Sequence, residues 1–210
     1  YCQKRGIKNV IQLGDTFDSR AALSYKAYHR CRETWFGNLE KHDIQMYMLV
    51  GNHDICYRHT LEINSPDLLL GEYKNITVIN KPTQIDINGT KIDIVPWLCD
   101  ENEADITTFM GRKGKGDICC GHFELSGFPM YKGVDSSHGT VKSMKMFEGY
   151  DRVFSGHYHT KSEKGNITYT GIPYEITWSD YADPKGFYVY DTTTGKYEFI
   201  RNPLTMFEKV

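Results

Sequence analysis

The sequence predicts an α/β fold in which β-strands form layered sheets with helices on their flanks. Residues 9–50 read as a strand–helix–strand unit, which is usually parallel with a right-handed crossover. Asn88-Gly89 lies between two apolar runs and is a strong hairpin signal. Several short apolar runs also end in a glycine followed by polar residues. This pattern is typical of strands whose carboxyl ends face a ligand.

The first elements follow from apolar periodicity. A short strand is expected at residues 9–13 and the next at 44–50. Between them, residues 20–39 predict a helix, because apolar side chains recur every four residues with charged ones between. Ser65-Pro66-Asp67 predicts the start of a short helix by its cap and first-turn proline, and a strand follows at 76–79.

The second half of the chain is predicted to be mostly β-structure. The expected elements are strands at 83–87 and 90–95, a helix at 101–110, strands at 117–120, 151–155 and 167–170, and a hairpin of 187–190 and 197–200. The glycine-containing stretch 123–140 is expected to be irregular and to lie on the active face. Because no repeat or low-complexity linker interrupts the chain, we expect one domain over residues 1–210.

Composition limits the class of protein. A hydrophobic content of 40%, a charged content of 25% and a net charge of −2 are typical of a soluble globular protein. No apolar run approaches membrane-spanning length, so we expect no membrane partner. The six cysteines form no Cys-x-x-Cys pair, which argues against a zinc finger and fits reduced thiols in the cytoplasm. The basic excess of many nucleic-acid binders is absent, but bound metals would supply local positive charge.

Four of the predicted strands end in a polar motif that begins with glycine. The motifs are Gly14-Asp15, Gly51-Asn52-His53-Asp54, Gly121-His122 and Gly156-His157-Tyr158-His159. Each motif alone is more often a turn or a structural histidine, but four together favour a metal site. A mixture of carboxylate, amide and imidazole ligands suits manganese, iron or zinc better than magnesium. A bridging carboxylate would allow a metal pair, a recurrent device of phosphoryl transfer.

These motifs, with the first extended by Thr16-Phe17-Asp18, resemble the signature of calcineurin-like metallophosphoesterases. A narrower resemblance is to the DNA-break-repair branch that contains SbcD and phage recombination nucleases. The runs that carry it are Pro96-Trp97-Leu98-Cys99, residues 121–128, Ser137-His138-Gly139, Gly171-Ile172-Pro173-Tyr174 and Gly186-Phe187. The resemblance implies a metallophosphoesterase β-sandwich with metals at the carboxyl ends of its strands.

The resemblance also implies a ligand set for two divalent metals. Asp15 would bridge them, Asn52, His122 and His157 would complete one shell, and His159 would bind the other metal. Manganese is the expected ion, with magnesium, iron and zinc as alternatives.

Two further roles come from the same resemblance. His53 would be the catalytic histidine that donates a proton to the leaving oxygen, and Asp18 would orient it.

The implied function is a metal-dependent DNA exonuclease or endonuclease subunit that hydrolyses phosphodiester bonds by a two-metal mechanism. Its implied partners are double-stranded DNA ends, an SMC-like ATPase subunit and a second copy of itself, in the cytoplasm of the cell or of a phage host. Two alternatives stay open: a small-molecule phosphodiesterase or phosphatase, and a non-catalytic clamp subunit.

One motif of the family is absent. The family's first strand carries Asp-x-His, whose two residues bind the metal shared with His159, and this sequence contains no Asp-x-His. We therefore expect the sequence to be truncated at its amino end and to lack most of the cap. We also expect the chain alone to hold at most one metal firmly, since two protein ligands rarely hold a transition metal.

Overall fold

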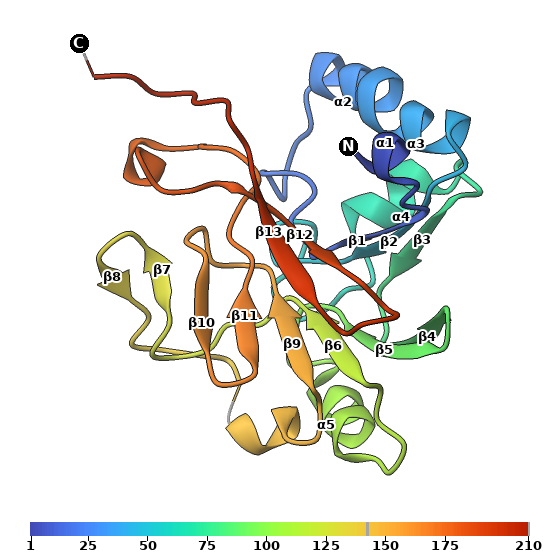
Figure 1. The fold of residues 1–210 in the computed structure, drawn as a ribbon, viewed down its shortest axis with the longest axis vertical. Coiled ribbons are helices and arrows are strands. Elements are labelled where there is room, and N and C mark those ends of the chain that lie inside the picture. The colour runs from blue at the N-terminus through green and yellow to red at the C-terminus, as the bar shows by residue number, and fades with distance from the viewer. Residues whose placement is uncertain (142, 210) are drawn as a thin grey trace.

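The computed structural model describes residues 1–141 and 143–209 (Figure 1). Its centre consists of two stacked sheets. The smaller is parallel in the order β1 (Asn9–Gln12), β2 (Gln45–Leu49) and β3 (Ile76–Ile79). Within this sheet β1 is an edge strand that pairs with β2 alone.

The larger sheet has six strands in the order β10-β11-β9-β6-β5-β4. Their bounds are Thr83–Ile87 for β4, Thr90–Val95 for β5, Ile118–Gly121 for β6, Arg152–Ser155 for β9, Ser162–Lys164 for β10 and Ile167–Tyr169 for β11. Strands β5, β6, β9 and β11 run parallel, whereas β4 and β10 are antiparallel to their neighbours. A separate hairpin pairs β12 (Gly186–Tyr190) with β13 (Tyr197–Arg201).

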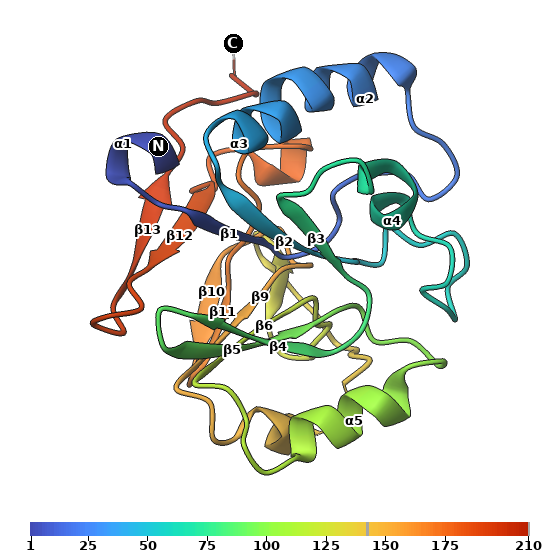
Figure 2. The same cartoon turned by 90° about the vertical axis from the view of Figure 1, so that its right-hand side faces the viewer.

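Helices cover the outer faces of both sheets, as Figure 2 shows. Helices α2 (Tyr25–Cys31), α3 (Gly37–Lys41) and α4 (Ser65–Leu70) lie over the small sheet, and α5 (Glu103–Gly111) lies under the large one. The short α1 (Cys2–Arg5) lies beside the β12–β13 hairpin. The expected α/β layers with flanking helices are confirmed.

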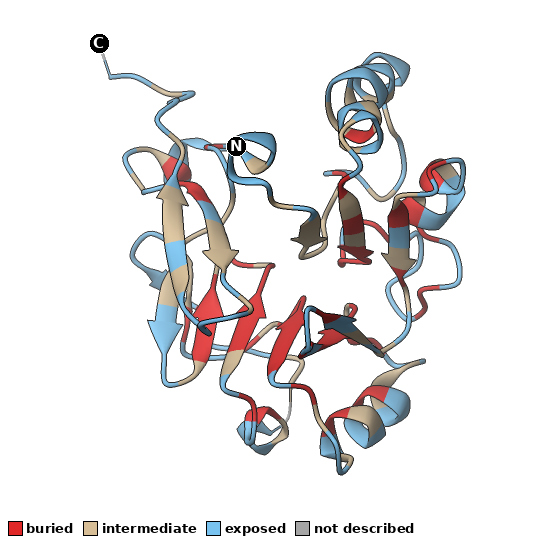
Figure 3. Cartoon of the chain, turned by 45° about the vertical axis from the view of Figure 1, so that its right-hand side comes forward, coloured by how far each residue is buried: buried red, intermediate tan, exposed pale blue. Residues whose placement is uncertain are grey.

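Apolar side chains fill the space between the layers. Leu49 and Ile79 of the small sheet share one buried cluster with Ile94, Cys120 and Phe154 of the large sheet. Figure 3 shows the corresponding concentration of buried residues along the central strands. The polar strand ends therefore project from a rigid apolar base.

The prediction of a helix at residues 20–39 is wrong at both ends. It begins at Tyr25 and extends to Lys41, and its middle turn, Arg32–Phe36, is a π-helix. Leu23 extended the apolar period beyond the true start of the helix, because it packs against the same apolar cluster without being helical. A side chain at Gly37 would approach the Arg32 carbonyl to 2.8 Å, so this glycine accommodates the wider turn.

Three other details differ from the sequence prediction. The cap of α4 is Asn64, which accepts a hydrogen bond from the Asp67 N–H at 2.9 Å, and Pro66 is the second helical residue. Stretch 123–140 is largely irregular but contains a small hairpin of β7 (Pro129–Tyr131) and β8 (Val134–Asp135). Strand β10 was not predicted either. Strands of two or three residues are too short to show a period.

The remaining helical turns are short. The 3₁₀ helices η2 (Met144–Phe147) and η3 (Trp178–Asp180) connect strands of the second half. Over the described residues, no helix is long and apolar enough to cross a membrane.

Candidate metal centre

The four glycine-containing motifs lie at the carboxyl ends of four strands, two from each sheet. Gly14-Asp15 and residues 51–54 follow β1 and β2, while Gly121-His122 and residues 156–159 follow β6 and β9. Each pair of strands is parallel, so its two ends lie at one edge. The stacking of the sheets brings the two edges together.

Two of the motif glycines allow the strand ends to approach one another. A side chain at Gly14 would collide with the His122 ring, and the φ of Gly14 is 93°. A side chain at Gly51 would collide with the backbone and the carboxylate of Asp15. Glycine at both places therefore lets a carboxylate and an imidazole from different sheets meet.

Asp54, the last residue of the second motif, clamps the first two loops together. Its carboxylate is buried, and Oδ2 accepts hydrogen bonds from the N–H groups of Asp15 and Gly51, each at 2.9 Å. Oδ1 accepts from the N–H groups of Thr16 at 2.9 Å and Phe17 at 3.2 Å. Burial raises the pKa of Asp54 to about 6, against the opposing effect of these donors. The motif contained Asp54, but its role as a clamp was not predicted.

Asp15 stands at the centre of the site. Its Oδ1 accepts the His53 N–H at 2.7 Å, and its Oδ2 lies 3.2 Å from His122 Nε2. Burial alone would raise the pKa of Asp15, but the charge and hydrogen bond of His122 lower it to about 2. The carboxylate is therefore ionised at neutral pH and suited to bind a cation.

Asn52, His122 and His157 converge on one another. The Asn52 Oδ1 atom lies 2.9 Å from both His122 Nε2 and His157 Nδ1. The other nitrogen of His122, Nδ1, donates to the Leu13 carbonyl at 2.6 Å, so Nε2 is the nitrogen that faces the site. Asp15, His122 and His157 offer ligand atoms that all lie within 4.8 Å of one another.

The surroundings of the two imidazoles shift their pKa values in opposite directions. Burial would lower the pKa of His122, but the adjacent Asp15 carboxylate raises it. Burial and the neighbouring His122 lower the pKa of His157 to about 3, so that ring is neutral. The Trp97 ring packs against both, with centroids 5.8 Å from His122 and 5.2 Å from His157.

His159 lies outside this convergent cluster. Its Nδ1 is 3.6 Å from Asp180 Oδ1, and its ring packs edge-on against Tyr131 at 5.1 Å. Burial lowers the pKa of His159, which keeps the ring neutral. The structure thus brings together Asp15, Asn52, His122 and His157, and places His159 beside a different carboxylate.

His53 and Asp18 are in contact, but not through the Asp18 side chain. The His53 Nδ1 atom lies 2.7 Å from the Asp18 backbone carbonyl. Because a carbonyl only accepts, Nδ1 carries the hydrogen and Nε2 is left free. The ring is exposed at the rim of the site.

Two carboxylates beside the histidines were not predicted from the sequence. Glu124 Oε1 lies 3.8 Å from His157 Nε2, and Asp180 approaches His159 as described. Glu124 stands two residues after His122, a signal that sequence reading could have used. Asp180 is 21 positions beyond His159 in the printed sequence, and no local pattern connects the two.

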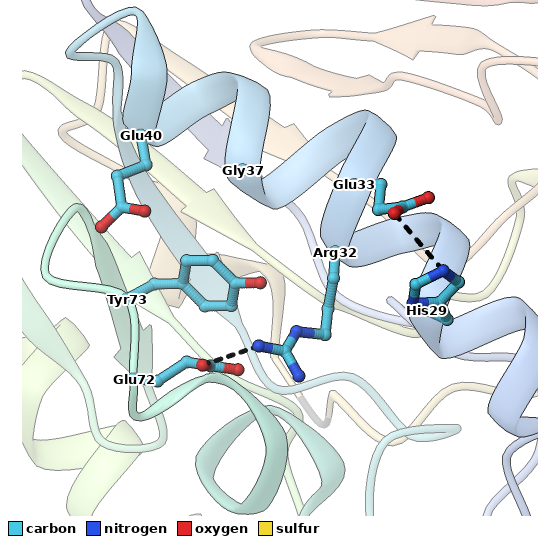
Figure 4. Close-up of a pocket in the computed structure, with 7 residues that line it drawn as sticks. All are labelled: His29, Arg32, Glu33, Gly37, Glu40, Glu72 and Tyr73. Atoms are coloured by element: carbon cyan, nitrogen blue, oxygen red, sulfur yellow. Dashed lines mark hydrogen bonds and ion pairs between the residues drawn. The ribbon is translucent and has the colours of Figure 1, made fainter.

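A separate surface hollow of about 510 Å³ contains none of these residues. Figure 4 shows that its side chains come from the α2–α3 helix and from the segment after α4. They include two ion pairs, His29–Glu33 at 3.3 Å and Arg32–Glu72 at 2.9 Å. Opposite charges pair within the hollow, so its lining resembles a solvated face more than a reaction site.

Comparison with known proteins agrees with this geometry. The family model described as calcineurin-like phosphoesterase matches residues 3–161. The chain belongs to this family. It is also 39% identical over 210 residues to exonuclease subunit 1 of Enterobacteria phage T4. That match covers all of this chain and 60% of the length of the phage protein. An archaeal phosphodiesterase structure is similar with a TM-score of 0.45 and 13% identity, covering 96% of this chain and 87% of that one.

The residues present fit the divalent metal that this family binds. A low-pKa carboxylate, an amide oxygen and two imidazole nitrogens from four strand ends face one point. Nitrogen and oxygen donors of this kind suit manganese, iron or zinc. His122 Nε2 is directed inward by its bond to a carbonyl, which is the usual support for a metal-binding histidine.

Proposed function

We propose that this phosphoesterase is a metal-dependent DNA nuclease subunit that acts on double-stranded ends in a recombination and break-repair complex. The proposal depends on one observation above others, the convergence of Asn52 Oδ1 with His122 Nε2 and His157 Nδ1 beside the ionised Asp15. Similarity to a phage exonuclease subunit over the full chain supports nuclease activity rather than hydrolysis of a small ester.

In this proposal Asp15, Asn52, His122 and His157 would hold one divalent metal. Asp15 would also serve a second metal, for which His159 is the other candidate ligand of this chain. When bound, such metals polarise a phosphoryl oxygen and neutralise the charge that develops during the displacement. Manganese is the proposed ion, since the donor set mixes nitrogen and oxygen.

His53 is the proposed proton donor. Its Nδ1–H is engaged by the Asp18 carbonyl, so Nε2 is the atom that would hold and release a proton at the leaving oxygen. The backbone N–H of the same residue donates to Asp15, which fixes the base of the side chain relative to the metal ligands. The proposed complex also contains an SMC-like ATPase and a second copy of the subunit. Its proposed location is the cytoplasm.

The test is a comparison of substrates in the presence of manganese. Linear duplex DNA, a cyclic nucleotide and an aryl phosphate monoester are each incubated with the chain and with the chain plus its candidate ATPase. We expect cleavage of duplex DNA in preference to both small esters. Preference for either small ester would show that the chain is a small-molecule phosphoesterase.

A non-catalytic clamp is a second candidate, and the position of His159 favours it for this chain. Among the described residues, the proposed ligands of the second metal are Asp15 and His159, and the convergent cluster of Asp15, His122 and His157 does not include His159. Binding of DNA and ATPase without cleavage at any manganese concentration would identify a clamp.

A further inference from the structure

A buried ion-pair cluster lies behind His159. The Lys185 side chain is 3% exposed, and its ammonium group donates to Asp180 Oδ1 at 3.0 Å and Asp183 Oδ2 at 2.8 Å. Its third hydrogen bond goes to the His159 backbone carbonyl at 2.8 Å. All three N–H groups of the lysine are therefore used, and one of them fixes the backbone of the candidate ligand.

Asp180 is also held from its opposite side. Its Oδ2 accepts from the N–H groups of Ile176 at 3.1 Å and Thr177 at 2.9 Å, which leaves Oδ1 to face Lys185 and His159. The ion pair with the Lys185 ammonium group and the two backbone donors hold Asp180 as a carboxylate in one orientation.

The His159 ring nitrogen that faces Asp180 has no competing partner. His159 Nδ1 is buried, and among the described residues it makes no hydrogen bond of ordinary length, with Asp180 Oδ1 at 3.6 Å. The His159 N–H donates to the Met130 carbonyl at 3.1 Å, so the backbone is held at both its N–H and its carbonyl. An ionised carboxylate can only accept, so this position favours a hydrogen on Nδ1.

We infer that the Asp180–Lys185 pair is a positioning device for His159 that keeps the hydrogen on Nδ1 and presents Nε2 as the metal-binding nitrogen. The inference rests on the proposed function, in which His159 is a ligand. Histidines that bind metals commonly donate their other N–H to a carboxylate, and loss of that partner costs roughly 10–100-fold in metal affinity. Lys185 has an indirect part: it holds Asp180 and the His159 carbonyl in one arrangement.

The test measures the tautomer of His159 directly. Two-bond proton–nitrogen correlation spectra of the ¹⁵N-histidine-labelled, metal-free chain at pH 7.5 report which ring nitrogen carries the hydrogen. We expect Nδ1–H in the wild-type chain. In Asp180→Asn the amide oxygen continues to accept from Ile176 and Thr177, which turns the NH₂ group toward His159. Because the NH₂ group is a donor, His159 Nδ1 should become the acceptor, and the ring hydrogen of His159 should move to Nε2.

Asp183→Asn is the matched control, since Asp183 contacts Lys185 but makes no described contact with His159. Its tautomer should remain Nδ1–H. If Asp180→Asn fails to fold because Lys185 is left buried opposite a neutral group, the double variant Asp180→Asn with Lys185→Met removes both charges. A wild-type Nε2–H form, or an unchanged tautomer in whichever of these variants folds, would overturn the inference.

The proposed function is tested separately in the same samples. Addition of Mn²⁺ should broaden the resonances of His122 and His157 in all variants, because Asp180 does not contact that cluster. An absence of broadening would overturn the proposed metal site, while the metal-free tautomer alone decides the role of Asp180.

Discussion

The two sides of the metal centre are held in different ways. Around Asn52, side chains from both sheets face one another, and the Asn52 Oδ1 atom lies 2.9 Å from His122 Nε2 and from His157 Nδ1. Around His159, the nearest carboxylate is already paired with Lys185 at 3.0 Å. The first side offers its donors to a metal, whereas the second holds a single imidazole in place.

This difference indicates an order of metal binding. Four donors that converge on one point hold a transition metal much more firmly than two. The Asn52 side should therefore bind the first ion, and the His159 side should bind a second ion weakly in this chain. In the proposed function Asp15 would contact both metals and His159 only the second, so substitutions at Asp15 and at His159 distinguish the two sides.

The largest effect is expected from Asp15→Asn. Loss of the carboxylate charge should weaken Mn²⁺ binding beyond the roughly 10–100-fold that loss of a supporting residue costs, and should abolish hydrolysis. His159→Ala is the matched change on the other side and should leave one Mn²⁺ bound. Calorimetric titration measures both. Equal losses in the two variants would show that the two sides are one site.

The second-largest effect is expected from His53→Ala, which separates the rate of hydrolysis from the affinity for Mn²⁺. The ring lies outside the convergent cluster, and only its backbone N–H contacts Asp15. Hydrolysis should fall by about 10²–10⁴-fold, the usual contribution of a general acid, at unchanged Mn²⁺ affinity. A variant that loses its metal would instead identify His53 as a ligand.

Much of this centre could be predicted because strand ends are local in sequence. An apolar run, a glycine and a polar residue occur within a few positions, so Asp15, Asn52, His122 and His157 were all visible. The stacking of two sheets that joins them is set by apolar packing, which the strand pattern also predicted.

The supporting residues could not be found in this way. Asp54 acts through four backbone N–H groups, and the orientation of such groups is not encoded in residue type. Asp180 and Lys185 reach His159 through a fold-dependent contact across an irregular segment. Periodicity also placed the start of the α2–α3 helix too early, because Leu23 packs against the same apolar cluster as the helix without being helical.

A stability effect is expected at Asp93, a buried carboxylate outside the metal centre whose partners among the described residues include no histidine. Asp93 accepts from Arg112 at 2.7 Å, from Tyr150 at 2.7 Å and from Gln84 at 2.8 Å. Burial would raise the pKa of Asp93, but these donors lower it. Its stabilising effect is therefore present above the unfolded pKa of about 3.9 and is lost as the pH falls below it.

Asp93→Asn should lower the free energy of unfolding at pH 7 by about 3–5 kcal/mol, because Arg112 is left without its anion. The loss should shrink as the pH falls below about 4, where the carboxylate of the unfolded chain takes up a proton, and should vanish once the folded carboxylate is protonated too. Urea unfolding at several pH values measures this. The control is Asp105→Asn on the exposed face of α5, which should change stability by less than about 0.5 kcal/mol. A loss that does not depend on pH would contradict the role of the charge.

The smallest effect is expected from Asp18→Ala, and it decides how His53 is oriented. The family resemblance implied Asp18 as the partner, but the atom that contacts His53 Nδ1 is the backbone carbonyl of Asp18, at 2.7 Å. Removal of the carboxylate leaves that carbonyl in place, so hydrolysis and its pH profile should match those of the wild-type chain. Asp18→Pro, which restricts the backbone at the same residue, is the contrasting variant and should reduce the rate. A large loss in Asp18→Ala would show that the carboxylate itself reaches His53 or the substrate during the reaction.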